Sequence, residues 1–249
     1  MAKKVVPEGE RRRRRPTRQG AVLSERLIVE TALRLLRYHS GAGLTVRRLG
    51  GALGADPSSL YRYFRGMDDL TLAIADELIG RAIDGWRPSG QWRSDLRALG
   101  LRLHAAYLAH PQAAVLAASR ITGRPHEAAA IEAILGVLRT AGFADADTVR
   151  VYRSLVDLSL AFAALDGAAL ALPEEKRDAD RAVWRSRYGT LTARTHPHIA
   201  ATAGLLVGCV EGSAYPATLD MLLDATAARL PTDRLPTDRL PKDHLSAGR

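Results

Sequence analysis

The stretch from Thr45 to Phe64, which reads T-V-R-R-L-G-G-A-L-G-A-D-P-S-S-L-Y-R-Y-F, constrains the fold of this chain most. Apolar residues recur every three or four positions after Thr45, which predicts a short helix with Thr45 as its N-cap. Gly54 suits the left-handed residue that ends such a helix. Asp56 and Pro57 then suit the cap and first position of a second short helix. The stretch therefore predicts two helices joined by a tight turn.

The second of these helices leaves small polar and aromatic side chains outside the core, which suits entry into the DNA major groove. An ordinary helical hairpin with a solvated second helix is the alternative, because helix-turn-helix patterns are degenerate. On the DNA reading, the residues expected at base edges are Ser58, Tyr61 and Arg62. Those expected at phosphates are Thr45, Arg47, Ser59 and Tyr63.

The composition favours an all-α protein. Ala, Leu and Arg are abundant, β-branched runs are rare, and aromatic residues make up only 5% of the chain. The single cysteine, Cys209, excludes an internal disulfide and lies in an apolar run, so we expect it to be buried. No secretory signal is visible, and the apolar stretch 199–210 is too short to span a bilayer, so we expect a cytoplasmic protein.

The net charge of +9 is concentrated at the N-terminus, where residues 1–20 hold eight basic and two acidic side chains. Such a segment has little apolar surface to bury, and we expect residues 1–20 to form a disordered arm. An arginine run beside a DNA-reading helix can follow phosphates or enter a minor groove. Binding of RNA or polyphosphate, or a plain solubilising role, are the alternatives. The run comprises Arg11, Arg12, Arg13, Arg14 and Arg15.

Residues 23 to about 83 resemble the DNA-binding domain of the tetracycline-repressor (TetR) family of bacterial regulators. The resemblance is carried by T-V-R-R-L at 45–49, L-Y-R-Y-F at 60–64 and D-D-L at 68–70. It implies a three-helix domain, which we place at 21–84, with a first helix at 24–38 packed across the helix pair. The family often has lysine near a phosphate where this chain has Met67, so the corresponding phosphate contact is in question.

Residues 91–230 are expected to form a larger helical domain, separated from the first by Gly85, Pro88 and Gly90. Helices are predicted at 92–109, 112–119, 127–140, 146–172, 197–212 and 217–230. The helix at 146–172 is apolar almost all round, which indicates burial on one face and a partner subunit on the other. The five-residue near-repeat L-P-T-D-R indicates a disordered tail at 231–249.

The larger domain also resembles the effector-binding and dimerisation domain of the tetracycline-repressor subgroup, through W-R-S-D-L-R-A-L at 92–99 and T-L-D-M-L-L-D at 218–224. The resemblance implies a dimer built from the helices at 146–172 and 217–230 of each subunit. The dimer contacts expected on this basis are Val156, Leu160, Leu219, Leu222 and Leu223. The effector contacts expected are His104, Tyr107, Leu116, Leu135, Tyr152 and Phe162, with core or surface positions as the alternative for these side chains.

Enzyme chemistry has no support in the sequence. There is no nucleophile elbow, dinucleotide fingerprint or phosphate-binding lysine loop, and we expect no cofactor and no metal site. We therefore predict a homodimeric transcriptional regulator, most simply a repressor, that binds an inverted-repeat operator in double-stranded DNA and is released by a small apolar or aromatic effector. The alternatives are a sequence-tolerant architectural DNA-binding protein, and a helical carrier or enzyme with a vestigial DNA motif.

Overall fold

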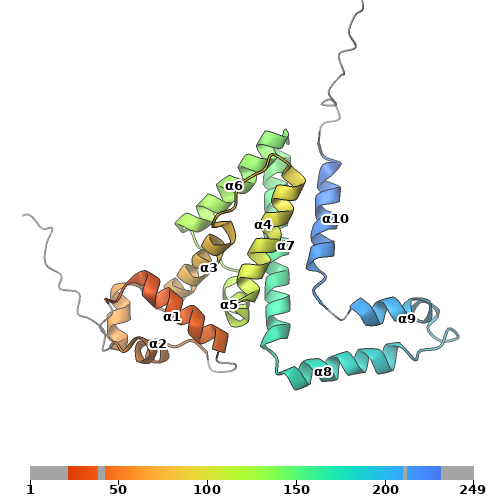
Figure 1. Ribbon diagram of the computed structural model, residues 1–249, viewed down its shortest axis with the longest axis horizontal. Helices are drawn as coiled ribbons and strands as arrows, with labels where there is room; N and C mark the ends of the chain where they lie inside the picture. The colour runs from red at the N-terminus through yellow and green to blue at the C-terminus, as the bar shows by residue number, and fades with distance from the viewer. Residues whose placement is uncertain (1–21, 39–42, 210–211, 231–249) are drawn as a thin grey trace, which may run out of the picture.

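The computed structural model describes residues 22–38, 43–209 and 212–230, and within them it contains helices and no strand (Figure 1). This confirms the all-α prediction; the arginine run and the tail at 231–249 lie outside the described residues. The helices are α1 (Glu25–Tyr38), α2 (Val46–Leu53), η1 (Pro57–Arg62), α3 (Met67–Ile83), α4 (Trp92–Leu108), α5 (Pro111–Ala117), α6 (Pro125–Ala141), α7 (Asp145–Ala171), α8 (Glu174–Val183), η2 (Trp184–Tyr188), α9 (Pro197–Cys209) and α10 (Tyr215–Ala227).

The local signals of the helix-turn-helix segment are confirmed. The Thr45 side chain accepts a hydrogen bond from the backbone N–H of Arg48 at 3.2 Å, and Gly54 adopts a φ of 60°. The Asp56 carboxylate accepts from the backbone N–H of Ser58 at 2.8 Å. The second helix, η1, is a six-residue 3-10 helix, in keeping with the tendency of such helices to be short.

The core consists of two hydrophobic clusters, and the boundary between them does not coincide with the predicted domain boundary in the sequence. The first joins the buried faces of α1, α2, η1 and α3 to α5 and to Ala163 of α7. The second joins α4, α6, α7 and α10 around Leu96, Leu138, Leu155 and Leu219. Helix α5 therefore packs with the DNA-reading part, although it follows the predicted boundary at 85–90.

Helix α7 is the central helix of the larger part and packs against α4, α5, α6 and α10 (Figure 1). It approaches α5 closely at Gly167, where a Cβ atom would lie 2.9 Å from the Cβ of Ala114. Helix α7 is long and apolar enough to cross a membrane. A single helix of this kind is weak evidence for a membrane span, because the core helices of soluble proteins can have the same length and composition.

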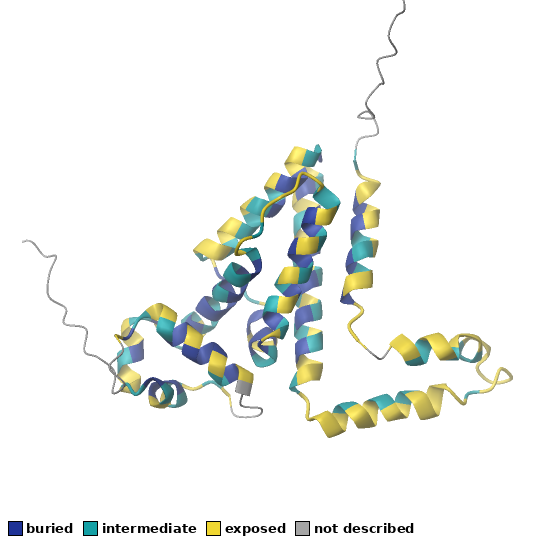
Figure 2. Ribbon diagram, viewed as in Figure 1, coloured by how far each residue is buried: buried dark blue, intermediate teal, exposed yellow. Residues whose placement is uncertain are grey.

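Helices α8 and α9, with η2 between them, form an arm that leaves the end of α7 and returns at α10 (Figure 1). Neither α8 nor α9 contains a buried residue, as Figure 2 shows, although α9 is almost entirely apolar. Leu205 is 77% exposed. Cys209 is also exposed, so its predicted burial was wrong: the arm has no core of its own in which to bury it.

Candidate nucleic-acid interface and the helices behind it

The reading head, defined as α1, α2 and η1 with the start of α3, presents polar side chains around the N-terminus of α2. Arg47, Tyr61 and Arg62 are exposed, as are Thr45 and Ser58. The Thr45 oxygen accepts the capping bond and keeps its own hydrogen to donate. Backbone N–H groups at a helix N-terminus attract anions such as phosphate. The surface can therefore bind a phosphate backbone and present side chains to base edges.

Two expected phosphate contacts are engaged within the protein instead. The Tyr63 hydroxyl donates to the backbone carbonyl of Leu23 at 2.6 Å, across 40 residues of sequence. The Ser59 hydroxyl donates to the backbone carbonyl of Asp56 at 2.5 Å. Each hydroxyl has a single hydrogen, which is already used, so neither can donate to a phosphate in this conformation. We correct both assignments: these side chains hold the reading head together.

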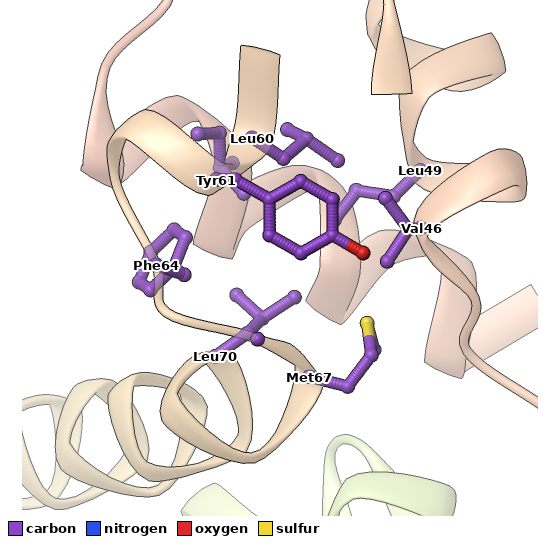
Figure 3. A pocket seen from close by; sticks show the side chains of 9 residues that line it. Val46, Leu49, Leu60, Tyr61, Phe64, Met67 and Leu70 are labelled. Atoms are coloured by element: carbon purple, nitrogen blue, oxygen red, sulfur yellow. The ribbon is translucent and has the colours of Figure 1, made fainter. Parts of the chain in front are cut away.

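An apolar hollow lies between α2, η1 and the start of α3. It is a shallow hollow, partly open to solvent, that the side chains of these three elements line. Figure 3 shows Val46, Tyr61 and Met67, from three different elements, around this space. The buried residues beneath it are Ile28, Leu49, Leu60, Phe64 and Leu70. The sequence pattern placed Tyr61 outside the core but gave no sign that Met67 would lie beside it.

Two arginines in the segment between α5 and α6 connect the larger part to the reading head. Arg120 donates to the Asp68 carboxylate at 2.6 Å, and this bond lowers the pKa of Asp68 below its usual value. Arg124 reaches Glu25 at the start of α1, at 2.9 Å, and Asp69 at 2.7 Å. The contacts span 52 to 99 residues of sequence, so no local pattern could have predicted them.

A second connection is made at the corner between α4 and α5. His110 lies there with its Nδ1 3.3 Å from the carbonyl of Leu33 in α1 and its Nε2 3.3 Å from Arg81 in α3. Arg81 in turn binds Glu30 of α1 at 2.8 Å. Burial, followed by the charge of Arg81, lowers the pKa of His110, which favours a neutral ring that donates to Leu33 and accepts from Arg81. Both connections end on α1 or α3.

Helix α3 also holds the N-terminus of α6. The carboxylate of Asp76, which is 6% exposed, accepts from the backbone N–H of Glu127 at 2.9 Å and lies 3.0 Å from the Nδ1 of His126. The Glu127 carboxylate reaches back to the backbone N–H of Gly123 at 2.6 Å. The Asp76 bond satisfies an N–H group that the first turn of α6 leaves unpaired, and the Glu127 bond holds the chain where it enters the helix. Sequence reasoning missed Asp76, because its partners lie some 50 residues away.

The expected effector contacts do not all meet in one place. Tyr107 is only 1% exposed and packs in the first core cluster, with its hydroxyl 3.5 Å from the carbonyl of Ala75; burial raises its pKa. Leu116 is 49% exposed on α5. These two assignments are corrected, because one side chain is closed off in the core and the other faces solvent. Leu135 and Tyr152 are half-buried.

His104 instead belongs to a polar and aromatic cluster that joins α4, α7 and the start of α10. Its Nε2 lies 2.8 Å from the carboxylate of Asp166, which also accepts from the Ser213 hydroxyl. The His104 ring stacks on Tyr215 at 4.4 Å between centroids, and Phe162 lies at 5.6 Å from Tyr215. Burial raises the pKa of Tyr215 to about 12. Of these residues the sequence analysis named His104 and Phe162; Tyr215 and Ser213 were missed, because no pattern distinguishes them.

Two of the expected dimer contacts lie inside the protomer. Leu219 and Leu223 have no exposed surface and pack in the second core cluster, so these assignments were wrong. The half-buried candidates are Val156, Leu160 and Leu222. The apolar side chains that α7 and α10 leave outside include Leu165, 65% exposed, and Met221, 70% exposed. The sequence placed α7 and α10 close to their observed bounds, but the family resemblance assigned part of the inner face of α10 to the dimer contact.

The fold and the site define an all-α protein with an N-terminal helix-turn-helix and a helical domain behind it. Residues 28–74 match the family model described as bacterial regulatory proteins, tetR family. Residues 85–228 match the model described as the tetracyclin repressor-like C-terminal domain. The chain belongs to the tetR family of bacterial regulatory proteins.

Similar proteins agree with this assignment. The chain is 31% identical over 138 residues to an HTH-type transcriptional regulator of Saccharopolyspora erythraea, covering 54% of this chain and 58% of that protein. It is 30% identical over 145 residues to the HTH-type transcriptional repressor DrrR1 of Streptomyces coeruleorubidus, covering 55% and 51%. The match thus spans only a little over half the length of these curated relatives.

Among solved structures, a possible TetR family transcriptional regulator from Streptomyces coelicolor A3(2) is 30% identical, with a TM-score of 0.67, covering 82% of this chain and 99% of that one. ActR of Streptomyces coelicolor, solved in complex with actinorhodin, has a TM-score of 0.68 at 21% identity and covers 83% and 94%. At that identity the ActR comparison supports the fold alone.

Proposed function

We propose that the protein is a ligand-responsive transcriptional repressor that binds an inverted-repeat operator as a homodimer. The observation that carries the proposal is the capped helix-turn-helix, whose exposed face combines Arg47, Tyr61 and Arg62 with the N-terminus of α2. Ser58, Tyr61 and Arg62 would contact base edges. Thr45 and Arg47 would contact phosphates, joined by the arginine run at 11–15. The name of DrrR1 as a repressor supports the sign of regulation.

The homodimer is supported by apolar surface that one protomer leaves uncovered. The outer faces of α7 and α10 carry Leu165 and Met221, and the described residues of α8, η2 and α9 include no buried one. An apolar helix such as α9 is stable in water only against another surface. Among the described residues, none lies within 4 Å of where a Cβ atom on Gly204 or Gly208 would be, so this edge of α9 is open to a partner helix.

We further propose that the two predicted domains have separate functions: residues 21–84 bind DNA, and residues 91–230 bind the effector and the second subunit. The effector would be a small apolar or aromatic molecule near the His104 cluster, where stacked rings lie beside the Asp166 carboxylate. That position borders the arm where it rejoins α10 (Figure 1). Effector binding would weaken DNA binding, and by linkage DNA would weaken effector binding by the same factor.

The first experiment is selection of bound sequences from a random duplex library at about 150 mM salt, near physiological ionic strength. Enrichment of an inverted repeat is expected. Arg62→Ala should alter the enriched sequence, whereas Arg139→Ala, an exposed arginine on α6, should leave it unchanged. Retention of all DNA without enrichment would instead support the architectural alternative, with a steep salt dependence shared by all sequences.

Assembly is tested by sedimentation of the full chain. Met221→Glu places a charge on the outer face of α10 and is expected to yield monomers, because an apolar interface does not bury an unpaired carboxylate. Thr140→Glu, an exposed change at the end of α6, is the control and should remain dimeric. A Met221→Glu protein that sediments as the wild type would place the dimer contact elsewhere.

A further inference from the structure

The hollow between α2, η1 and α3 is not explained by phosphate binding. Seven of its nine lining residues have side chains of carbon or sulfur only, Gly66 has no side chain, and the ninth residue is Tyr61. Phosphate contacts require donors or cations. Yet two of its lining residues, Val46 and Tyr61, are followed directly in the sequence by exposed arginines, and Val46 is the first residue of the capped helix α2.

The walls of the hollow are apolar side chains that the core does not take up. Tyr61 is 58% exposed, while Val46 and Met67 are half-buried at the first positions of α2 and α3. The core residues beneath them, Leu49 and Leu60, are already at most 5% exposed. Tyr61, Val46 and Met67 thus form an apolar patch beside cationic side chains, a combination that suits contact with an apolar group carried by an anionic polymer.

We propose that this hollow receives the C5-methyl group of a thymine in the operator, with Tyr61, Val46 and Met67 as its walls. Thymine is the base that presents an apolar group in the major groove. The phosphate-binding start of α2 would hold the backbone while the methyl group enters between Val46 and Met67 (Figure 3). The inference rests on the proposed binding of an operator and adds to it a specific base and the residues that select it.

The expected size of the effect follows from burial of one methyl group. Removing this methyl group from one half-site should weaken binding about fourfold, which corresponds to the roughly 0.8 kcal/mol gained by burying one CH₂-sized group. In a symmetric dimer, removal from both half-sites should weaken binding by roughly 15-fold, because distant independent sites are additive.

The test replaces thymine by uracil in the selected operator, one position at a time, and measures affinity for the full-length protein. Uracil keeps the hydrogen-bonding groups of thymine and lacks only the methyl group. One thymine in each half-site should show the fourfold loss with the wild-type protein. Met67→Ala, which removes one wall, should bring the thymine-to-uracil ratio at that position close to one. Tyr61→Phe, which keeps the ring, should preserve the ratio.

Met67→Leu provides a folded control that keeps apolar volume in the wall and should retain most of the discrimination. A library that enriches no sequence would overturn the proposed operator binding itself. An enriched operator in which every thymine tolerates uracil would overturn the methyl contact alone. If Met67→Ala weakens thymine and uracil operators equally, the hollow contacts a sugar of the backbone and the inference is wrong.

Discussion

The Tyr63 hydroxyl gives the clearest test of how the reading head is built. In the structure it donates to the carbonyl of Leu23 at 2.6 Å, tying η1 to the residues just before α1. An intramolecular hydrogen bond of this kind contributes about 1 kcal/mol net. Tyr63→Phe should therefore lower the free energy of unfolding by about 1 kcal/mol and the melting temperature by roughly 2–4 °C for a chain of this size.

Tyr61→Phe is the matched control, because the Tyr61 ring is 58% exposed and no partner of its hydroxyl is described. Its melting temperature should equal that of the wild type. Both variants are measured by thermal and by urea unfolding followed by circular dichroism, and Tyr63→Phe is also measured by operator binding at fixed salt. If Tyr63→Phe unfolds like the wild type but binds the operator several-fold more weakly, its hydroxyl serves a phosphate and the structural assignment is refuted.

Further predictions concern the connections behind the reading head. Asp76→Ala should cost about 2 kcal/mol in urea unfolding, because it removes a buried charged cap from α6. Arg124→Gln should weaken the attachment of the reading head and accelerate amide hydrogen exchange in α1, with the exchange of α10 unchanged. Hydrogen bonds from the backbone N–H of Arg65 and from the Arg124 side chain lower the pKa of Asp69. The ionised Asp69 should therefore stabilise the folded protein fully above about pH 4, and this contribution should be lost as the pH falls through the folded-state pKa. The acid unfolding of Asp69→Asn, followed by circular dichroism, should lack this contribution. Gly167→Val should cost about 1–3 kcal/mol by overpacking the contact between α7 and α5, measured by urea unfolding.

What could be predicted from the sequence is what depends on near neighbours. The Thr45 and Asp56 caps act within three residues and were predicted correctly, since residue type and spacing determine them. The expectations for Tyr63 and Leu219 differ from the structure, because neither the helix pattern nor the family resemblance shows which distant element a side chain meets. The hydroxyl of Tyr63 was expected at a phosphate and instead meets a carbonyl 40 residues away. Burial of Leu219 likewise depends on the approach of α4 and α7.

The same limit applies to the route by which the two parts of the chain communicate. From the sequence, α3 is the evident link, because it alone joins them covalently. The structure adds the segment between α5 and α6, whose Arg120 and Arg124 bind the first turn of α3 and the start of α1. Asp76 then ties α6 to the middle of α3.

A shift of α6 would therefore act on α3 at two positions along its length, near residues 68–69 and at residue 76, and would rotate that helix. Since α3 begins with Met67 at the edge of the hollow, a rotation of this kind would move the proposed base contact directly. If the proposed function holds, release from DNA would require no unfolding of the reading head, only a displacement of α6 that the arginine and aspartate contacts transmit.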